Sequence, residues 1–144
     1  MDVLAGVDAP DDFDLTMKLD LSAAAGGLAF RLDDEGGGYF VEFGPKSREV
    51  VLVKWMPERD AVSGARGYRR EELQRELLYE PFEGGTKTPV RLLVVGPYIE
   101  VSVRGEVVLA TFSGERMTGR WGIWAECGTA FADDVQIVTM RKPD

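Results

Sequence analysis

Hydrophobic and polar residues alternate along much of this chain. From Phe13 to Leu21 every second residue is apolar, and the residues between them are charged or carry a hydroxyl group. A period of two is typical of a β-strand that buries one face. Comparable apolar runs predict further short strands over residues 28–32, 39–43, 50–55, 90–95, 98–103, 106–111, 121–126 and 132–140.

Segments that contain glycine and proline separate these runs and predict turns. Residues 22–27, 33–38 and 44–47 are rich in the small and polar residues that turns favour. Arg104 and Gly105 stand between two strand-like runs, which predicts a hairpin with a two-residue loop. About nine short strands without alternating long helices predict an all-β fold, an antiparallel two-sheet β-sandwich or a barrel.

One polar stretch, residues 57–88, departs from this rhythm. Leu73 and Leu77 are four residues apart, which suits a helix, but together with Tyr79 they also fit an alternating strand. We expect a loop over residues 57–70, followed by a strand that ends at Pro81. The chain as a whole, residues 1–144, is predicted to form one β-sandwich domain with this polar excursion.

Charge and hydropathy narrow the range of partners. The chain has 17 Lys and Arg residues against 25 Asp and Glu residues, so its net charge is -8. Nucleic-acid binding needs clustered positive charge, which such an acidic chain does not supply. No apolar run approaches the roughly 20 residues of a membrane-spanning helix, and the start of the chain does not resemble a signal peptide. We therefore predict neither a nucleic-acid nor a membrane partner, and both an extracellular and a cytoplasmic location stay open.

The chain contains no histidine and a single cysteine, Cys127. Serine–histidine and cysteine–histidine catalysis, histidine zinc sites and internal disulfides are thereby excluded. We expect Cys127 to be an inert, partly buried thiol, and we expect no cofactor. Two acidic segments are candidate calcium ligands, residues 33–35 and the pair Asp133 and Asp134. Each segment is more typical of a charged turn whose side chains bond to the backbone.

Strand alternation also assigns side chains to faces. If the core takes Leu28, Phe30 and Leu32, and the equivalent residues of the other strands, the opposite face has an unusual composition. It carries Arg31, Phe40, Glu42, Glu100, Ser102, Trp124 and Glu126. Aromatic rings pack on the C–H patches of sugars, carboxylates accept from sugar hydroxyls and a guanidinium donates to them. The alternative is that arginine and glutamate pair across strands, with Phe40 and Trp124 packed under a loop or another domain.

Several segments, in their order along the chain, resemble a known group of proteins. The segments are DFDL, GGLAFR, GYFVEF, VRL, IEVSVRG, TGRWGIW and FADDV, at residues 12–15, 26–31, 38–43, 90–92, 99–105, 118–124 and 131–135. They resemble the concanavalin A-like jelly-roll module at the C-terminal end of glycoside hydrolase family 32 enzymes. Its carbohydrate-binding relatives include module family 66, which binds fructans, and the 3-keto-disaccharide hydrolase group has a similar pattern. The resemblance covers most of the chain outside residues 57–88.

The resemblance implies two antiparallel sheets, one of them concave, with a ligand site on the concave face. The positions that match are Arg31, Phe40, Glu42, Trp124 and Glu126. The paired carboxylates of the hydrolases belong to a separate propeller domain, so the resemblance implies no catalytic residues here. We predict a non-catalytic carbohydrate-binding module that recognises a sugar, such as the terminal fructose of a fructan, with Glu100 as a further ligand.

Two other functions stay open. The chain could be a structural accessory domain that packs on the catalytic domain of a glycoside hydrolase, in which case Phe40 and Trp124 would lie under protein. It could also be a relative of the 3-keto-glycoside hydrolases, which would require a deep pocket with two carboxylates or a metal. Glu42 and Glu126, if they lay on neighbouring strands, would be the residues to consider for hydrolysis.

Overall fold

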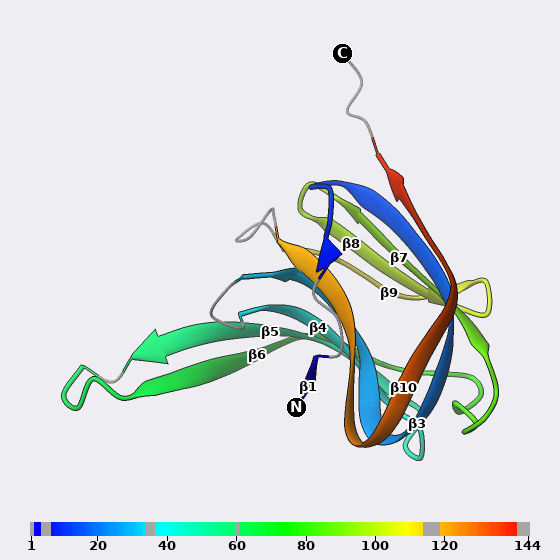
Figure 1. Ribbon diagram of the computed structural model, residues 1–144, viewed down its shortest axis with the longest axis horizontal. Coiled ribbons are helices and arrows are strands. Elements are labelled where there is room, and N and C mark those ends of the chain that lie inside the picture. Colours follow the sequence, from blue (N-terminus) through cyan, green and yellow to red (C-terminus); the bar gives the residue numbers. More distant parts are fainter. Residues whose placement is uncertain (1, 4–6, 34–36, 60, 114–118, 141–144) are drawn as a thin grey trace.

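The computed structural model describes residues 2–3, 7–33, 37–59, 61–113 and 119–140 (Figure 1). All regular secondary structure in these ranges is β-strand. The strands are β1 (Asp2–Val3), β2 (Val7–Asp8), β3 (Phe13–Leu32), β4 (Gly38–Gly44), β5 (Glu49–Arg59), β6 (Arg66–Leu77), β7 (Thr88–Val95), β8 (Tyr98–Val103), β9 (Glu106–Phe112) and β10 (Arg120–Thr139). Among the described residues, no helix is long and apolar enough to cross a membrane.

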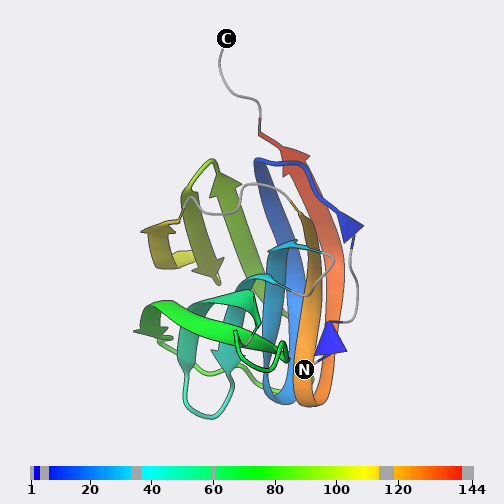
Figure 2. The same ribbon diagram turned by 90° about the vertical axis from the view of Figure 1, so that its left-hand side faces the viewer.

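Two long strands, β3 and β10, each belong to both layers of the molecule. The C-terminal half of β3 pairs with β4 and its N-terminal half with β7, while β10 follows β3 along most of its length. The first sheet therefore has the order β6-β5-β4-β3-β10, and the second has the order β9-β8-β7-β3-β10. Figure 2 shows β3 and β10 side by side, with β7–β9 in the upper part of the view and β4–β6 in the lower part. All these pairs are antiparallel, which confirms the predicted two-sheet β-sandwich.

The apolar residues that alternation predicted fill the space between the sheets. Phe13, Leu15 and Leu92 enter this core from the second sheet, and Phe30 and Val41 enter it from the first. Each of the five is at most 1% exposed. Full burial of such a side chain is worth roughly 1.5–3 kcal/mol, so the alternating positions supply most of the driving force for the sandwich.

The turn predicted over residues 22–27 is wrong, because the chain bends there without leaving the sheet (Figure 1). At the bend Ala23 remains paired with Gly128 of β10. Gly128 has a φ of 154°, and a Cβ atom there would lie 2.2 Å from the carbonyl oxygen of Ser22. Glycine is therefore needed for the two strands to stay paired through the bend. The two C-terminal strands that were predicted separately are likewise the halves of β10.

β5 and β6 form a long hairpin that projects from the body of the molecule (Figure 1). The sequence predicted a loop over residues 57–70, but β5 continues to Arg59 and β6 begins at Arg66. The strand ends at Leu77 rather than at Pro81. In the outer part of the hairpin, residues 57, 58 and 67–70 are exposed on both faces, so burial imposes no hydrophobic period on them.

Candidate functional site

Four predicted sugar ligands lie on the outer face of the first sheet, which points away from the core. The register places Trp124 of β10 opposite Gly27 of β3, and Gly27 opposite Glu42 of β4. Phe40 is two residues from Glu42 on β4, and Glu126 is two residues from Trp124 on β10. Residues two apart on a strand point to the same side, so all four share this surface. We call this surface, formed by the outward residues of β10, β3, β4, β5 and β6, the first face.

Phe40 and Trp124 form the floor of the first face rather than an open platform. Phe40 is 1% exposed and Trp124 is 2% exposed. Their rings meet edge to face with centroids 6.2 Å apart, and Trp124 Nε1 donates to the carbonyl oxygen of Val41 at 3.3 Å. They pack with Ala29 and with Leu32, which the sequence had placed in the core. Since both rings are covered by the chain itself, neither presents a face on which a sugar can stack.

An ion pair crosses this apolar floor. Arg70 of β6 donates from Nη2 to Oε2 of Glu42 at 2.7 Å. The Glu42 side chain is 21% exposed and that of Arg70 is 38% exposed. Val53, which lies between Phe40 and β6 in the register, is completely buried. The pair therefore lies at the boundary between the floor and solvent, where a charge-assisted hydrogen bond is only partly screened.

Two aromatic residues flank the ion pair. Trp55 of β5 lies opposite Arg70 in the register and packs against the Phe40–Trp124 cluster. Its ring meets the ring of Tyr68 edge to face, with centroids 6.1 Å apart. Tyr68 is 53% exposed, so the pair presents ring surface to solvent beside Arg70. Trp55 Nε1 is buried and has no acceptor in the described part of the chain.

The sequence did not reveal Trp55, Tyr68 and Arg70 as members of this face. Once residues 66–77 are recognised as a strand, alternation places Tyr68, Arg70 and Glu72 on the same side. The decisive information is the pairing of β6 with β5, which is a long-range contact without a local hydrophobic period. Because residues 57–70 were predicted to be a loop, the sequence did not identify the residues that β6 contributes to the first face.

A second ion network lies on the first face beside this pair. Arg75 donates to Oε1 of Glu72 at 2.6 and 3.1 Å and pairs with Glu49 at 2.8 Å. The hydrogen bond from Arg75 lowers the pKa of the Glu72 carboxyl. These three side chains satisfy one another, so the Glu42–Arg70 pair is the part of the first face best suited to engage a ligand.

Arg31 does not lie on the first face, which corrects the sequence prediction. It has a φ of 50° at a bulge, where the register of β3 and β10 shifts between Gly122 and Arg120. The bulge interrupts alternation, and Arg31 donates from Nη2 to the carbonyl oxygens of Asp11 at 3.2 Å and Gly96 at 2.7 Å. The residue is 1% exposed, and burial lowers the pKa of its guanidinium. Arg31 thus ties β3 to the turn between β7 and β8.

Glu100 and Ser102 lie on the other sheet, which is a second correction. Both belong to β8 and point outward from the second sheet, on a surface that we call the second face. Glu100 accepts a hydrogen bond from the Tyr98 hydroxyl at 2.7 Å. The sequence had grouped Glu100 and Ser102 with Glu42 and Trp124. Alternation shows that each of these side chains points away from the core, but it does not show to which of the two sheets the side chain belongs.

Two expectations about reactive groups also change. Glu42 and Glu126 are not on neighbouring strands, since β3 runs between β4 and β10. Cys127 is exposed rather than partly buried, with a φ of 55° at the bend of β10. These positions leave the first face without adjacent paired carboxylates among the residues that alternation had named.

The candidate calcium ligands are engaged with lysines. Asp133 forms an ion pair with Lys87, and Asp134 pairs with Lys18 at 3.3 Å. Asp133 Oδ1 also accepts from the backbone N–H of Asp134, as expected for an acidic turn. Across the described residues, no group of three or more His, Cys, Asp or Glu side chains is placed to hold a metal ion. Residues 34 and 35 of the other candidate segment lie outside the described residues.

The chain matches no protein-family model and no curated protein sequence, but it resembles solved structures. The carbohydrate-binding module of family 66 from Bacillus subtilis has a TM-score of 0.71 at 18% identity, over 93% of this chain and 77% of that one. Sheep galectin-11, solved with glycerol, has a TM-score of 0.63 at 13% identity, over 93% and 95% of the two chains. A galectin from Caenorhabditis elegans has a TM-score of 0.61 at 13% identity, over 93% and 89%.

At such low identity the likeness shows the fold alone. The chain is a jelly-roll β-sandwich, as predicted, and its resemblance to module family 66 is a resemblance of fold. The resemblance to glycoside hydrolase family 32 and to the 3-keto-disaccharide hydrolases stays a prediction from sequence. The fold alone does not identify a ligand, which depends on the residues of this chain's own surfaces.

Proposed function

We propose that this protein is a non-catalytic carbohydrate-binding domain that holds a sugar on its first face. The observation that carries the proposal is the Glu42–Arg70 ion pair beside the Trp55–Tyr68 aromatic pair, above an apolar floor. This combination of an acceptor, a donor fork and ring surface suits a ligand that has hydroxyl groups on its edge and C–H groups on its face.

The chemistry of the pair leaves groups available for a ligand. Its hydrogen bond uses one oxygen of Glu42 and one terminal nitrogen of Arg70. The other carboxylate oxygen accepts from a sugar hydroxyl, and the other guanidinium N–H groups donate to a second hydroxyl. The exposed ring of Tyr68 covers the C–H patch of the sugar. None of these contacts requires a proton transfer or a metal ion.

The similar folds support this class of ligand. One of the similar structures is a carbohydrate-binding module, and another was solved with glycerol, a small polyol. Fructans are the first ligands to test, because the sequence resembles module family 66. The terminal fructose of such a chain presents the adjacent hydroxyl groups that Glu42 and Arg70 would bind.

The test is calorimetric titration with levan and inulin oligosaccharides, followed by a broad glycan array. We expect Glu42→Gln and Arg70→Ala each to weaken binding about ten-fold, because each loses a hydrogen bond to a charged group. Both variants should remain folded, since a partly exposed ion pair contributes only about 0–1 kcal/mol. Failure of every glycan to bind would overturn the proposal.

β6 itself offers matched controls. Arg69 and Glu71 flank Arg70 and point to the opposite side of the strand, where they pair at 3.9 Å. Arg69→Ala and Glu71→Gln should therefore leave the affinity unchanged. Equal losses in these controls would show that binding depends on the strand's charge and not on the first face.

The absence of catalysis is part of the proposal and is tested on the same oligosaccharides. Incubation with the chain should release no smaller sugars. Turnover that disappears in Glu42→Gln would favour the hydrolase function instead. An accessory role was expected to place Phe40 and Trp124 under protein, but residues of this chain already bury them. Their burial therefore does not call for a partner domain.

A further inference from the structure

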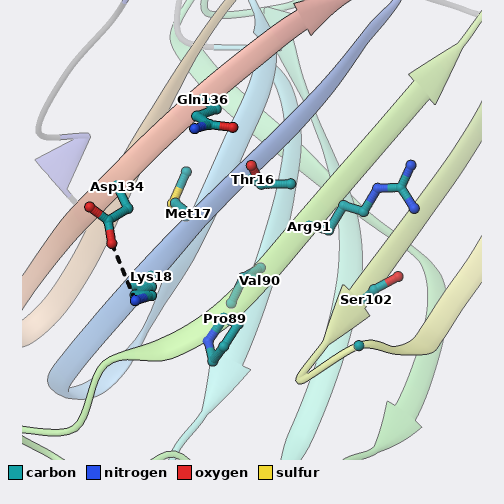
Figure 3. A pocket seen from close by; sticks show the side chains of 10 residues that line it. Thr16, Met17, Lys18, Pro89, Val90, Arg91, Ser102, Asp134 and Gln136 are labelled. Atoms are coloured by element: carbon teal, nitrogen blue, oxygen red, sulfur yellow. Dashed lines mark ion pairs between the residues drawn. The ribbon is translucent and has the colours of Figure 1, made fainter.

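We infer that the second face is a second saccharide-binding surface, which takes a neutral oligosaccharide chain lying along the strands of the second sheet. The inference takes its ligand class from the proposed function but uses an entirely separate set of residues. A cavity of about 410 Å³ opens on this face (Figure 3). Its polar lining is formed by Thr16, Lys18, Arg91, Ser102, Asp134 and Gln136.

Four of these residues form one continuous row. The register pairs Gln136 of β10 with Thr16 of β3, Thr16 with Arg91 of β7, and Arg91 with Ser102 of β8. Figure 3 shows these side chains crossing the hollow on successive strands. Because neighbouring strands are separated by about 4.8 Å, the row extends over about 14 Å. An oligosaccharide that lies along the strands crosses this row, so the sugar ring at the crossing has polar side chains on more than one strand within reach.

Two irregularities of the backbone flank the hollow, one on β10 and one in the turn between β8 and β9. At Asp134 the backbone has a φ of 51°, and the register of β10 with β3 shifts between Asp133 and Gln136. This bulge kinks β10 locally and interrupts its ladder with β3. On the far side, Gly105 has open space around its absent side chain. The bulge and the glycine are thus backbone features that contribute to the shape of the hollow together with the side chains that line it.

The charges that line the hollow are compensated within the protein. Arg91 donates from Nε and Nη2 to both carboxylate oxygens of Asp14, at 2.8 and 2.7 Å, and Lys18 pairs with Asp134 at 3.3 Å. The bidentate hydrogen bond that Arg91 donates to Asp14 raises the pKa of the Arg91 guanidinium. A lining with balanced charges favours a neutral ligand over a phosphate or a cation.

The uncharged groups of the row are the ones available to a ligand. All three line the hollow: the Gln136 side chain is exposed, Thr16 is half-buried and Ser102 is 6% exposed. Two hydroxyl groups and a carboxamide both donate and accept, as sugar hydroxyls do. The row therefore matches a polyhydroxyl ligand better than an apolar or a charged one.

An aromatic platform lies on the same face, further along the strands. Tyr98 and Phe112 are paired in the register of β8 and β9, and their ring centroids are 5.3 Å apart. Phe112 is 74% exposed, and Tyr98 donates to Glu100 Oε1 at 2.7 Å. Tyr98 is four residues from Ser102, which corresponds to about 13 Å along a strand. An oligosaccharide that stacks on Phe112 can therefore reach the polar row.

The test is chemical-shift mapping of the full chain by NMR with levan and inulin oligosaccharides, together with a count of sites by calorimetry. We expect two separate sets of shifted amides, one on each face. Phe112→Ala and Gln136→Ala should each weaken binding at the second face about five-fold and leave the first face unchanged. Tyr79→Ala is the matched control, because Tyr79 is 92% exposed but lies on neither face.

The outcomes separate this inference from the proposed function. Arg70→Ala should weaken the response of the first face about ten-fold, while the shifts around Arg91 keep their wild-type concentration dependence. If only the first face responds to any oligosaccharide, the inference is overturned and the proposed function stands. If only the second face responds, the inference stands and the proposed site is wrong. A dimer in sedimentation velocity that Phe112→Ala dissociates, with no sugar response there, would identify the surface as a self-interface and overturn the inference.

Two saccharide sites on opposite faces have a consequence for function. A domain with both sites bridges two glycan chains or two segments of one chain, so its apparent affinity for a polysaccharide exceeds that for an oligosaccharide. Levan should therefore form cross-linked complexes with the wild-type chain. Loss of these complexes in both Arg70→Ala and Phe112→Ala is the expected result.

Discussion

The first and second faces arise from the same alternating pattern but expose opposite kinds of group. On the first face the rings of Phe40 and Trp124 are buried and the Glu42–Arg70 pair is partly open. On the second face Phe112 is 74% exposed, while Arg91 is held by both oxygens of Asp14. An aromatic residue that points away from the core is therefore not necessarily accessible.

Neighbouring strands explain this difference. Beside Trp124, β3 carries Gly27 and Ala29, whose small size lets the indole ring lie over the sheet and reach the Val41 carbonyl. Phe112 belongs to β9, which, among the strands that the structure describes, ends the second sheet and pairs on one side only. Local sequence around the two rings does not contain this information. It depends on which strand lies alongside.

The largest difference that we expect between the two faces is in the stability lost when each aromatic ring is removed. We expect Trp124→Ala to lower the free energy of unfolding by about 3–5 kcal/mol, because it leaves a cavity under the first face. Phe112→Ala should change it by about 0.5 kcal/mol or less, since that ring is mostly in solvent. Denaturant unfolding measures both. Similar values for the two variants would mean that the faces do not differ in the burial of their rings.

A second test concerns Arg31, which the sequence placed on a ligand face. Arg31→Ala leaves the carbonyl oxygens of Asp11 and Gly96 without their charged donor, so we expect a loss of about 1.5–3 kcal/mol in the free energy of unfolding. The affinity of the folded fraction for fructan oligosaccharides should not change. Arg69→Ala is the control and should unfold as the wild type does. A variant of Arg31 that is fully stable but no longer binds sugar would restore the original prediction.

The smallest effect that we expect concerns the ion pair between Lys87 and Asp133 at the edge of the second sheet. The hydrogen bond from Lys87 lowers the pKa of the Asp133 carboxyl below its ordinary value of about 3.8. Its folded-state pKa is depressed, so the stabilisation is present above about pH 4 and is lost as the pH falls through the folded value. A carboxyl carbon titration by NMR should show a low midpoint that rises in Lys87→Met. An unchanged midpoint in that variant would show that the pair does not persist in solution.

Much of the fold followed from local patterns. The alternation from Phe13 to Leu21 identified the core face of β3, and the hairpin at Arg104 and Gly105 is present as predicted. The bend after Leu21 was mistaken for a turn, because glycines that allow strands to bend together resemble glycines that end strands. The outer half of the β5–β6 hairpin was missed, since a strand with two solvent faces has no period to detect.

The site was predicted less completely than the fold. Alternation placed Phe40, Glu42, Trp124 and Glu126 on one surface, and the register agrees. It misplaced Arg31, because one left-handed residue at a bulge changes the direction of the side chain. Arg70 was missed altogether, since its position over Glu42, 28 residues away in the sequence, depends on the pairing of β6 with β5 and of β5 with β4.

By itself, the sequence determined most of the residues that enter the core, the all-β class and the absence of histidine chemistry. These properties depend on composition and on a period of two, which are local. Only the tertiary structure decided which outward residues share a face, which rings are covered and which charges are already paired. Those properties depend on bends, bulges and the order of strands in each sheet, and they arise from contacts between residues far apart in the chain.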